Sequence, residues 1–152
     1  MILNRRLLIG GLILALAAAA AEPGFKAQFV GGTLAGLKAK SNARLDLTSA
    51  DAMVFRCTGQ TLNIAYPKIE TLEYGQHVSR RYAAAVLLSP VLLLSKSRQH
   101  YVTLGYTDAD GQHQALVFRL EKGDIRGALA SLEARSGRRV EFQDDEARKA
   151  GQ

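Results

Sequence analysis

Residue types that often carry out catalysis occur in this chain of 152 residues, but none has the spacing that a familiar chemistry requires. The three histidines, His77, His100 and His113, stand in three different segments. Two of them could meet across strands, but a metal site would need further ligands that the sequence does not indicate. Serine, histidine and aspartate are all present, yet no serine has the glycine-flanked context of a nucleophile elbow. We therefore expect a protein that is not an enzyme and holds neither a cofactor nor a metal.

Other candidate positions have simple structural explanations. Residues 108–111 begin like a calcium loop, but their acidic spacing is too short and no glutamate closes the loop, so a hairpin turn is expected. The single cysteine, Cys57, cannot form an internal disulfide, and we expect a small buried side chain rather than a nucleophile. Gly31 and Gly32 favour a bulge or turn over a phosphate-binding loop. Glu70 is expected to be a solvated charge.

Residues 83–94 are uncharged and mostly apolar. Pro90 argues against a continuous helix and against a central strand. Because cations flank the segment, it has the layout of an apolar loop that enters a membrane surface while the cations meet lipid headgroups. A buried segment that closes one end of a barrel fits the same composition. The candidate membrane or partner contacts are Arg80, Arg81, Leu87, Leu88, Val91, Leu92, Leu93, Lys96 and Arg98.

The charge balance argues against a nucleic-acid partner. The whole chain carries a net charge of +6, with 20 basic and 14 acidic residues. Without Arg5 and Arg6 of the leader, 18 basic and 14 acidic residues leave +4. This mild excess supports weak attraction to anionic lipids or polymers, whereas nucleic-acid binding would need the charge concentrated on one element.

Residues 1–21 have the features of a cleavable secretory signal. Arg5 and Arg6 form a basic start, an apolar run follows at residues 7–16, and small residues precede Glu22. The apolar run is shorter than the roughly twenty residues of a membrane-spanning helix, although a retained anchor remains open if the alanines are included. We expect an exported protein, located in a periplasm or outside the cell.

Two hydrophobic periods in the sequence predict the strands and the helix that hold the candidate residues in place. Apolar side chains that alternate with other residues are typical of strands. They predict strands near residues 45–47, 53–57, 62–66, 69–78, 101–107 and 115–120, and an apolar patch at residues 29–30 in a Gly-rich stretch predicts a first strand, which makes about seven. Turns at residues 58–60 and 108–111 join the third strand to the fourth and the sixth to the seventh.

One helix is expected after the last hairpin. Apolar side chains recur at i, i+3, i+4 and i+7, which predicts one buried helical face formed by Ile125, Ala128, Leu129 and Leu132. Asp124 is placed to cap the first turn, and Gly137 can end the last turn in a left-handed conformation. Residues 124–136 are therefore predicted to be helical, and residues 139–142 are expected to pair at a sheet edge.

Residues 64–69 (Ile-Ala-Tyr-Pro-Lys-Ile) run into residues 72–75 (Leu-Glu-Tyr-Gly), and residues 95–104 and 128–135 add two further framework pieces. With the order of strands and helix, these pieces resemble the pleckstrin-homology-like superfold, as seen in a group of small secreted bacterial proteins. The resemblance implies an α+β, mostly β fold. Its core would be a bent antiparallel sheet or partly open barrel, capped by one C-terminal amphipathic helix.

The chain after the leader is long enough for a single domain, expected over residues 22–142 and followed by a polar C-terminal tail at residues 143–152. The resemblance covers about residues 29–142. It brings no catalytic residues. Relatives that bind phosphoinositides use a basic cluster on the loop of the first hairpin, where this chain offers only Lys38, Lys40 and Arg44.

The function expected from the sequence is that of a non-enzymatic exported envelope domain. It would bind a protein partner or an anionic membrane surface through the sheet edge, the groove beside the helix or the apolar segment at residues 83–94. The alternative is a small-ligand or lipid carrier that holds its ligand inside the bent sheet. The sequence leaves both open, because residues 83–94 could fill the barrel mouth or line a pocket.

Overall fold

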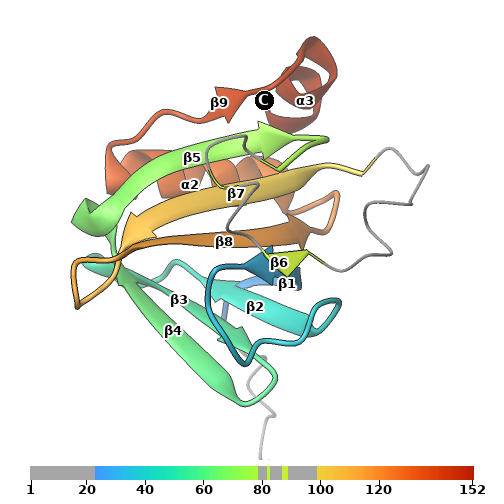
Figure 1. The fold of residues 1–152 in the computed structure, drawn as a ribbon. Helices are drawn as coiled ribbons and strands as arrows, with labels where there is room; N and C mark the ends of the chain where they lie inside the picture. The colour runs from blue at the N-terminus through green and yellow to red at the C-terminus, as the bar shows by residue number, and fades with distance from the viewer. Residues whose placement is uncertain (1–22, 79–81, 83–86, 89–98) are drawn as a thin grey trace, which may run out of the picture.

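The computed structural model describes residues 23–78, 82, 87–88 and 99–152 (Figure 1). These residues form one bent, unclosed, mainly antiparallel sheet with helices at its C-terminal end, which confirms the α+β, mostly β class. The strands are β1 (Phe25–Gly32), β2 (Asn42–Asp46), β3 (Ala52–Cys57), β4 (Gln60–Ala65), β5 (Ile69–Gly75), β6 (Leu87–Leu88), β7 (Tyr101–Thr107), β8 (His113–Leu120) and β9 (Glu141–Phe142). The helices are the 3-10 turn η1 (Tyr66–Lys68), α2 (Ile125–Ser136) and α3 (Asp145–Gly151).

The strand order is β4-β3-β2-β1-β8-β7-β5-β9, and β6 pairs with β1 off this path. The first four strands form an antiparallel meander, β5, β7 and β8 form a second, and β8 pairs with β1 to join them. The seven longer strands match the predicted number, and β6 and β9 are two-residue additions.

The two predicted hairpin turns are present. In the β7–β8 turn, the Asp108 carboxylate accepts hydrogen bonds from the amides of Asp110 (3.0 Å) and Gln112 (2.8 Å). Gly111 has φ 77°, a conformation that costs glycine little. In the β3–β4 turn, Thr58 and Gly59 both have positive φ, so the chain reverses within two residues.

Strand β1 contains a bulge, and its side chains pack on both faces of the sheet. The pairing of β1 with β8 shifts between Phe29 and Gly31, as expected for this glycine pair. Phe29 belongs to the inner core, whereas Val30 packs in a separate cluster on the outer face. The first half of β1 pairs with β2, and Gly31 and Gly32 pair with β6.

Helix α2 covers the inner face with the predicted side chains, since Ile125, Ala128, Leu129 and Leu132 are all buried in the core. Gly137 ends the helix with φ 69°, as predicted. The capping role predicted for Asp124 is wrong. Asp124 has helical backbone angles and makes no side-chain cap; its carboxylate instead accepts a hydrogen bond from the Lys26 amide at 3.3 Å.

The prediction of a polar tail at residues 143–152 is also wrong, because most of these residues form α3. The Asp144 carboxylate caps this helix by accepting from the Ala147 amide at 2.7 Å. Ala147 is fully buried, and β9 pairs with the edge of β5 just before the helix. The buried face of α3 consists of small residues, which produce no hydrophobic period in the sequence. The domain is therefore capped by two helices rather than one.

Candidate functional site

The predicted contact residues are only partly covered by the structure. Leu87 and Leu88 form β6, whose backbone pairs antiparallel with Gly32 and Gly31. The other predicted contacts lie outside the described residues: Arg80, Arg81, Val91, Leu92, Leu93, Lys96 and Arg98. The structure therefore does not bring the predicted contact residues together into a site, and any candidate site lies elsewhere on the described surface.

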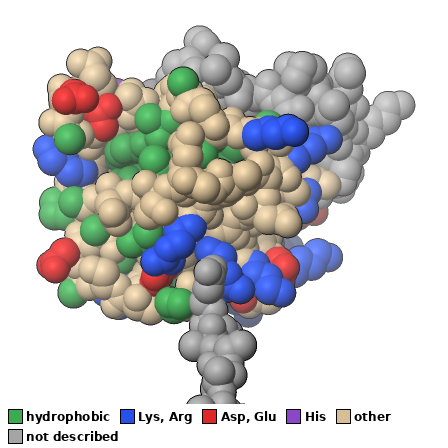
Figure 2. Space-filling model, turned by 90° about the horizontal axis from the view of Figure 1, so that it is seen from below, with side chains coloured by type: hydrophobic (Ala, Val, Ile, Leu, Met, Phe, Trp, Pro, Cys, Tyr) green, Lys and Arg blue, Asp and Glu red, His purple; other side chains and the backbone are tan. Residues whose placement is uncertain are grey.

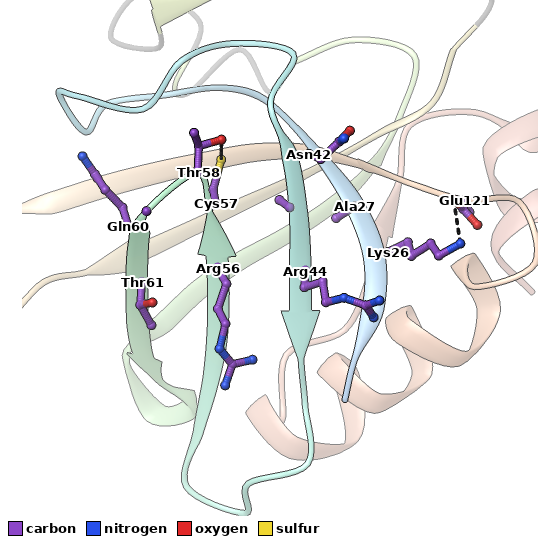
Figure 3. Close-up of a pocket in the computed structure, with 12 residues that line it drawn as sticks. Lys26, Ala27, Asn42, Arg44, Arg56, Cys57, Thr58, Gln60, Thr61 and Glu121 are labelled. Carbon is purple, nitrogen blue, oxygen red and sulfur yellow. Dashed lines mark hydrogen bonds and ion pairs between the residues drawn. The ribbon is translucent and has the colours of Figure 1, made fainter. Parts of the chain in front are cut away.

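A row of cations crosses the outer face of the first meander. Lys26 on β1 is the register partner of Arg44 on β2, and Arg44 is the register partner of Arg56 on β3. Their strand neighbours, such as Ala43 and Phe55, point into the core, so the three cations point outward. Figure 3 shows the three side chains leaving adjacent strands side by side. We call Lys26, Arg44 and Arg56 the cationic row.

Such a row is unfavourable in an isolated sheet, because like charges directly opposite each other on neighbouring strands repel. Each cation of the row contacts a nearby oxygen atom that offsets part of this repulsion. Lys26 Nζ lies 3.9 Å from Glu121, and Arg44 donates to the Gly24 carbonyl at 3.2 Å. Arg56 Nη1 donates to Asp46 Oδ2 at 3.1 Å. The row is thus held in place by local contacts that leave its cations at the surface.

Asp46 is the most buried charged group beside this row, with only 6% of the residue exposed. Its Oδ1 accepts from the Thr48 hydroxyl at 2.7 Å and from the Thr48 amide at 3.0 Å. These hydrogen bonds, followed by the one from Arg56, hold the Asp46 pKa below its ordinary value. Asp46 therefore stays ionised and fixes Arg56 in position.

The row borders an open pocket of about 700 Å³ that extends to the β3–β4 turn. Its lining residues are Lys26, Ala27, Asn42, Ala43, Arg44, Arg56, Cys57, Thr58, Gly59, Gln60, Thr61 and Glu121. Burial raises the pKa of the Cys57 thiol, so this side chain is not activated as a nucleophile. The pocket offers cationic and neutral hydrogen-bond donors, which suit an anionic group.

Basic character continues along the same face. Arg119 on β8 is the partner of Gln28 on β1, which in turn pairs with Asn42 on β2. The Arg119 guanidinium donates a short hydrogen bond to the Gln99 side chain. Seen from below, the molecule shows a band of Lys and Arg side chains with single carboxylates beside them (Figure 2).

The interior of the bent sheet is filled by aromatic side chains. The Phe29 and Phe55 ring centroids are 6.5 Å apart, and those of Phe55 and Phe118 are 5.4 Å apart. Each of these rings is at most 2% exposed. Side chains thus occupy the space that a carried ligand would use.

The histidines lie in separate environments. His113 Nδ1 is 3.0 Å from Glu70, which also accepts a short hydrogen bond from Thr107, and these contacts lower the Glu70 pKa, the Thr107 bond most. His100 stacks on Tyr74, with centroids 5.3 Å apart. Within the described ranges, no group of three His, Cys, Asp or Glu side chains could hold a metal ion. No helix of the described part of the chain is long and apolar enough to cross a membrane.

Sequence reasoning missed the cationic row. Arg44 was noted as part of a loop cluster, but Lys26 and Arg56 lie 18 and 12 positions from it and belong to other strands. Only the pairing of β1, β2 and β3 brings the three together. Short hairpin turns fix such a register in a sequence, and the connection from β1 to β2 is too long to do so.

Comparison with known proteins assigns the chain to no family. The chain matches no protein-family model, no curated protein and no solved structure.

Proposed function

We propose that this protein is an exported, non-enzymatic binding domain that attaches to an anionic membrane surface through the cationic row. The observation that carries the proposal is the register that places Lys26, Arg44 and Arg56 directly opposite one another on the outer face. Repulsion within the row is relieved when anionic groups bind across it.

The expected strength is that of a reversible association. Each Lys or Arg near an anionic bilayer contributes about 1 kcal/mol, so the three cations supply at most about 3 kcal/mol, and less to the extent that Asp46 and Glu121 offset the charges of Arg56 and Lys26. Neighbouring strands are about 4.8 Å apart, so the row spans about 10 Å and presents its charges on one face. A flat row of this kind fits the many equivalent headgroups of a membrane better than one deep ligand site.

The position of the row in the chain supports the same function. Lys26 follows the apolar leader by five residues, which span at most about 17 Å when extended. If the leader is retained as an anchor, the row lies within reach of the headgroups. If the leader is cleaved, association depends on the charges alone, and the binding remains sensitive to salt.

The resemblance to the pleckstrin-homology-like superfold remains part of this proposal. The resemblance implies a bent antiparallel sheet capped by a C-terminal helix, and the bent sheet with α2 over its core supports this part of the proposal. The carrier alternative has less support, because Phe29, Phe55 and Phe118 fill the interior of the sheet.

Vesicle sedimentation tests the proposal. The exported protein, expected by mass spectrometry to begin near Glu22, should sediment with vesicles that contain phosphatidylglycerol and not with phosphatidylcholine alone. Lys26→Gln and Arg44→Gln should each weaken the association about fivefold, which corresponds to about 1 kcal/mol per charge. Raising the salt concentration should weaken the binding of the wild-type protein.

Arg139→Gln is the matched control, because Arg139 is exposed, follows α2 in the chain and does not line the pocket beside the row. It removes the same charge and should change the association less than twofold. Equal loss of binding in Arg139→Gln and Arg44→Gln would show that only net charge matters. A wild-type protein that never sediments with anionic vesicles would refute the proposed function.

A further inference from the structure

A second pocket, of about 810 Å³, lies where the sheet meets both helices. It is formed by Tyr74 of β5, the two residues before β7, the end of β8 with the residues that follow it, the first turn of α2 and one side of α3. Its lining residues are Tyr74, Gln99, His100, Arg119, Leu120, Glu121, Lys122, Ile125, Arg126, Glu146 and Ala150. The volume lies in the range of small-molecule sites.

Two polar atoms of its lining residues lack partners. Tyr74 is only 1% exposed, and its hydroxyl has no hydrogen-bond partner among the described residues. The same holds for Nε2 of His100, whose ring stacks on Tyr74. A buried polar atom without a partner costs about 1–3 kcal/mol, so such atoms call for an explanation. Burial raises the Tyr74 pKa to about 12, so its hydroxyl keeps its proton and remains a donor.

The N-terminus of α2 adds a positive end to the pocket. The Ala128 amide bonds to the Asp124 carbonyl, but the Asp124 side chain caps none of the earlier amides of this 12-residue helix. These amides and the helix dipole favour a negative group nearby. Arg126 in the first turn and Lys122 just before it line the same wall.

Two carboxylates also line the pocket, and both are engaged. Glu121 lies 3.9 Å from Lys26 Nζ, and Glu146 accepts a hydrogen bond from Gln76 at 3.1 Å. The lining thus carries three cations, Arg119, Lys122 and Arg126, against two carboxylates, and its charge balance is positive by one. Its apolar lining comes from Leu120, Ile125 and Ala150.

We propose that this pocket binds a small organic anion, with its negative group at the N-terminus of α2 beside Arg126 and its apolar body against Leu120, Ile125 and Ala150. The site adjoins the pocket beside the cationic row, with which it shares Glu121, and the binding of a small anion there goes beyond membrane attachment. Tyr74 and His100 are among the lining residues, and the ligand supplies the acceptor that the buried Tyr74 hydroxyl lacks.

The test uses 1-anilinonaphthalene-8-sulfonate, a fluorescent aromatic anion, titrated into the exported protein without vesicles. Benzoate should displace it, and benzyl alcohol, which has the same ring without the charge, should not. Arg126→Gln should weaken binding about fivefold or more. Arg148→Gln, an exposed arginine of α3 outside the pocket, should change it less than twofold.

Tyr74→Phe separates a ligand contact from a structural role. Because the hydroxyl has no partner in the free protein, its removal should leave the melting temperature unchanged or higher while it weakens probe binding about threefold or more. Probe binding that is equal in the wild type and both pocket variants would overturn the proposal. Equal displacement by benzoate and benzyl alcohol would also overturn it, because the site would then not select an anion.

Discussion

The two halves of the sheet share one inner core but treat their outer faces differently. Over β7, β8 and the end of β1, the outer face is covered by a second apolar cluster of Val30, Tyr82, Tyr101, Ala115 and Val117, with Val78 packed against it. Over β1, β2 and β3, the outer face carries the cationic row. We call these the covered half and the open half.

The difference appears in the burial of the strands. In β3, buried and half-buried residues alternate, as expected for a strand with one wet face. In β7, Tyr101 to Tyr106 are all buried, because Tyr82 lies on the outer face and its hydroxyl is 3.2 Å from Thr71 Oγ1. The covered half thus buries both faces of its strands, whereas the open half leaves its cations on the outer face.

The largest effect is expected where both halves share a core. Leu132 is fully buried in α2, so Leu132→Ala should lower the free energy of unfolding by about 2–5 kcal/mol. Arg126→Ala should cost less than about 0.5 kcal/mol, because this side chain is exposed and a cation near a helix N-terminus is not favourable. Urea unfolding measures both. Equal urea midpoints would mean that the wrong face of α2 was taken as buried.

An intermediate effect is expected in the covered half. A Cβ atom at Gly105 would clash with Tyr82 Oη and Thr71 Oγ1. Gly105→Ala should therefore displace Tyr82 and cost about 1–3 kcal/mol, measured by thermal unfolding. Gly123→Ala is the matched control, since a Cβ atom there meets nothing within 4 Å. If both variants melted alike, Tyr82 would not cover the sheet in the way described.

The smallest effect is expected in the open half, and it depends on pH. The Asp46 pKa is lowered in the folded protein, so this carboxyl adds stability above its unfolded pKa of about 3.9 and loses that contribution as the pH falls through the folded value. Asp46→Asn should have a lower urea midpoint than the wild type at pH 7, and the difference should shrink below about pH 4. The difference between Leu132→Ala and the wild type provides the control, because no titrating group is changed. A deficit of Asp46→Asn that stays constant with pH would contradict the role given to this carboxylate.

The sequence by itself determined those strands, turns and helix ends that depend on residues close together in the chain. Alternation indicated six of the seven longer strands, β2 to β5, β7 and β8, and an apolar patch indicated β1. Asp108 and Gly111 indicated the β7–β8 turn through a side-chain acceptor and a positive φ. The helical period identified the buried face of α2, and Gly137 marked its end. These features are determined by residues a few positions apart, which is why they can be read without the fold.

The sequence of α3 contains a helix signal, but a weak one. Asp144 is its cap, Asp145 and Glu146 stand in the first turn, and Arg148 and Lys149 stand in the last, an order that suits the helix dipole. These charges made the segment look like a solvated tail. A helix this short depends on tertiary packing, which here comes through Ala147.

Only the tertiary structure decided which residues form the candidate sites. Lys26, Arg44 and Arg56 meet because three strands pair in one register, and Tyr82 covers β7 because Gly105 leaves room for it. Tyr74, His100 and Arg126 line one pocket because α2 and α3 pack against the sheet there. The physical reason is the same in each case: these contacts join residues far apart in the chain, and their register depends on the packing of the whole domain rather than on any local pattern.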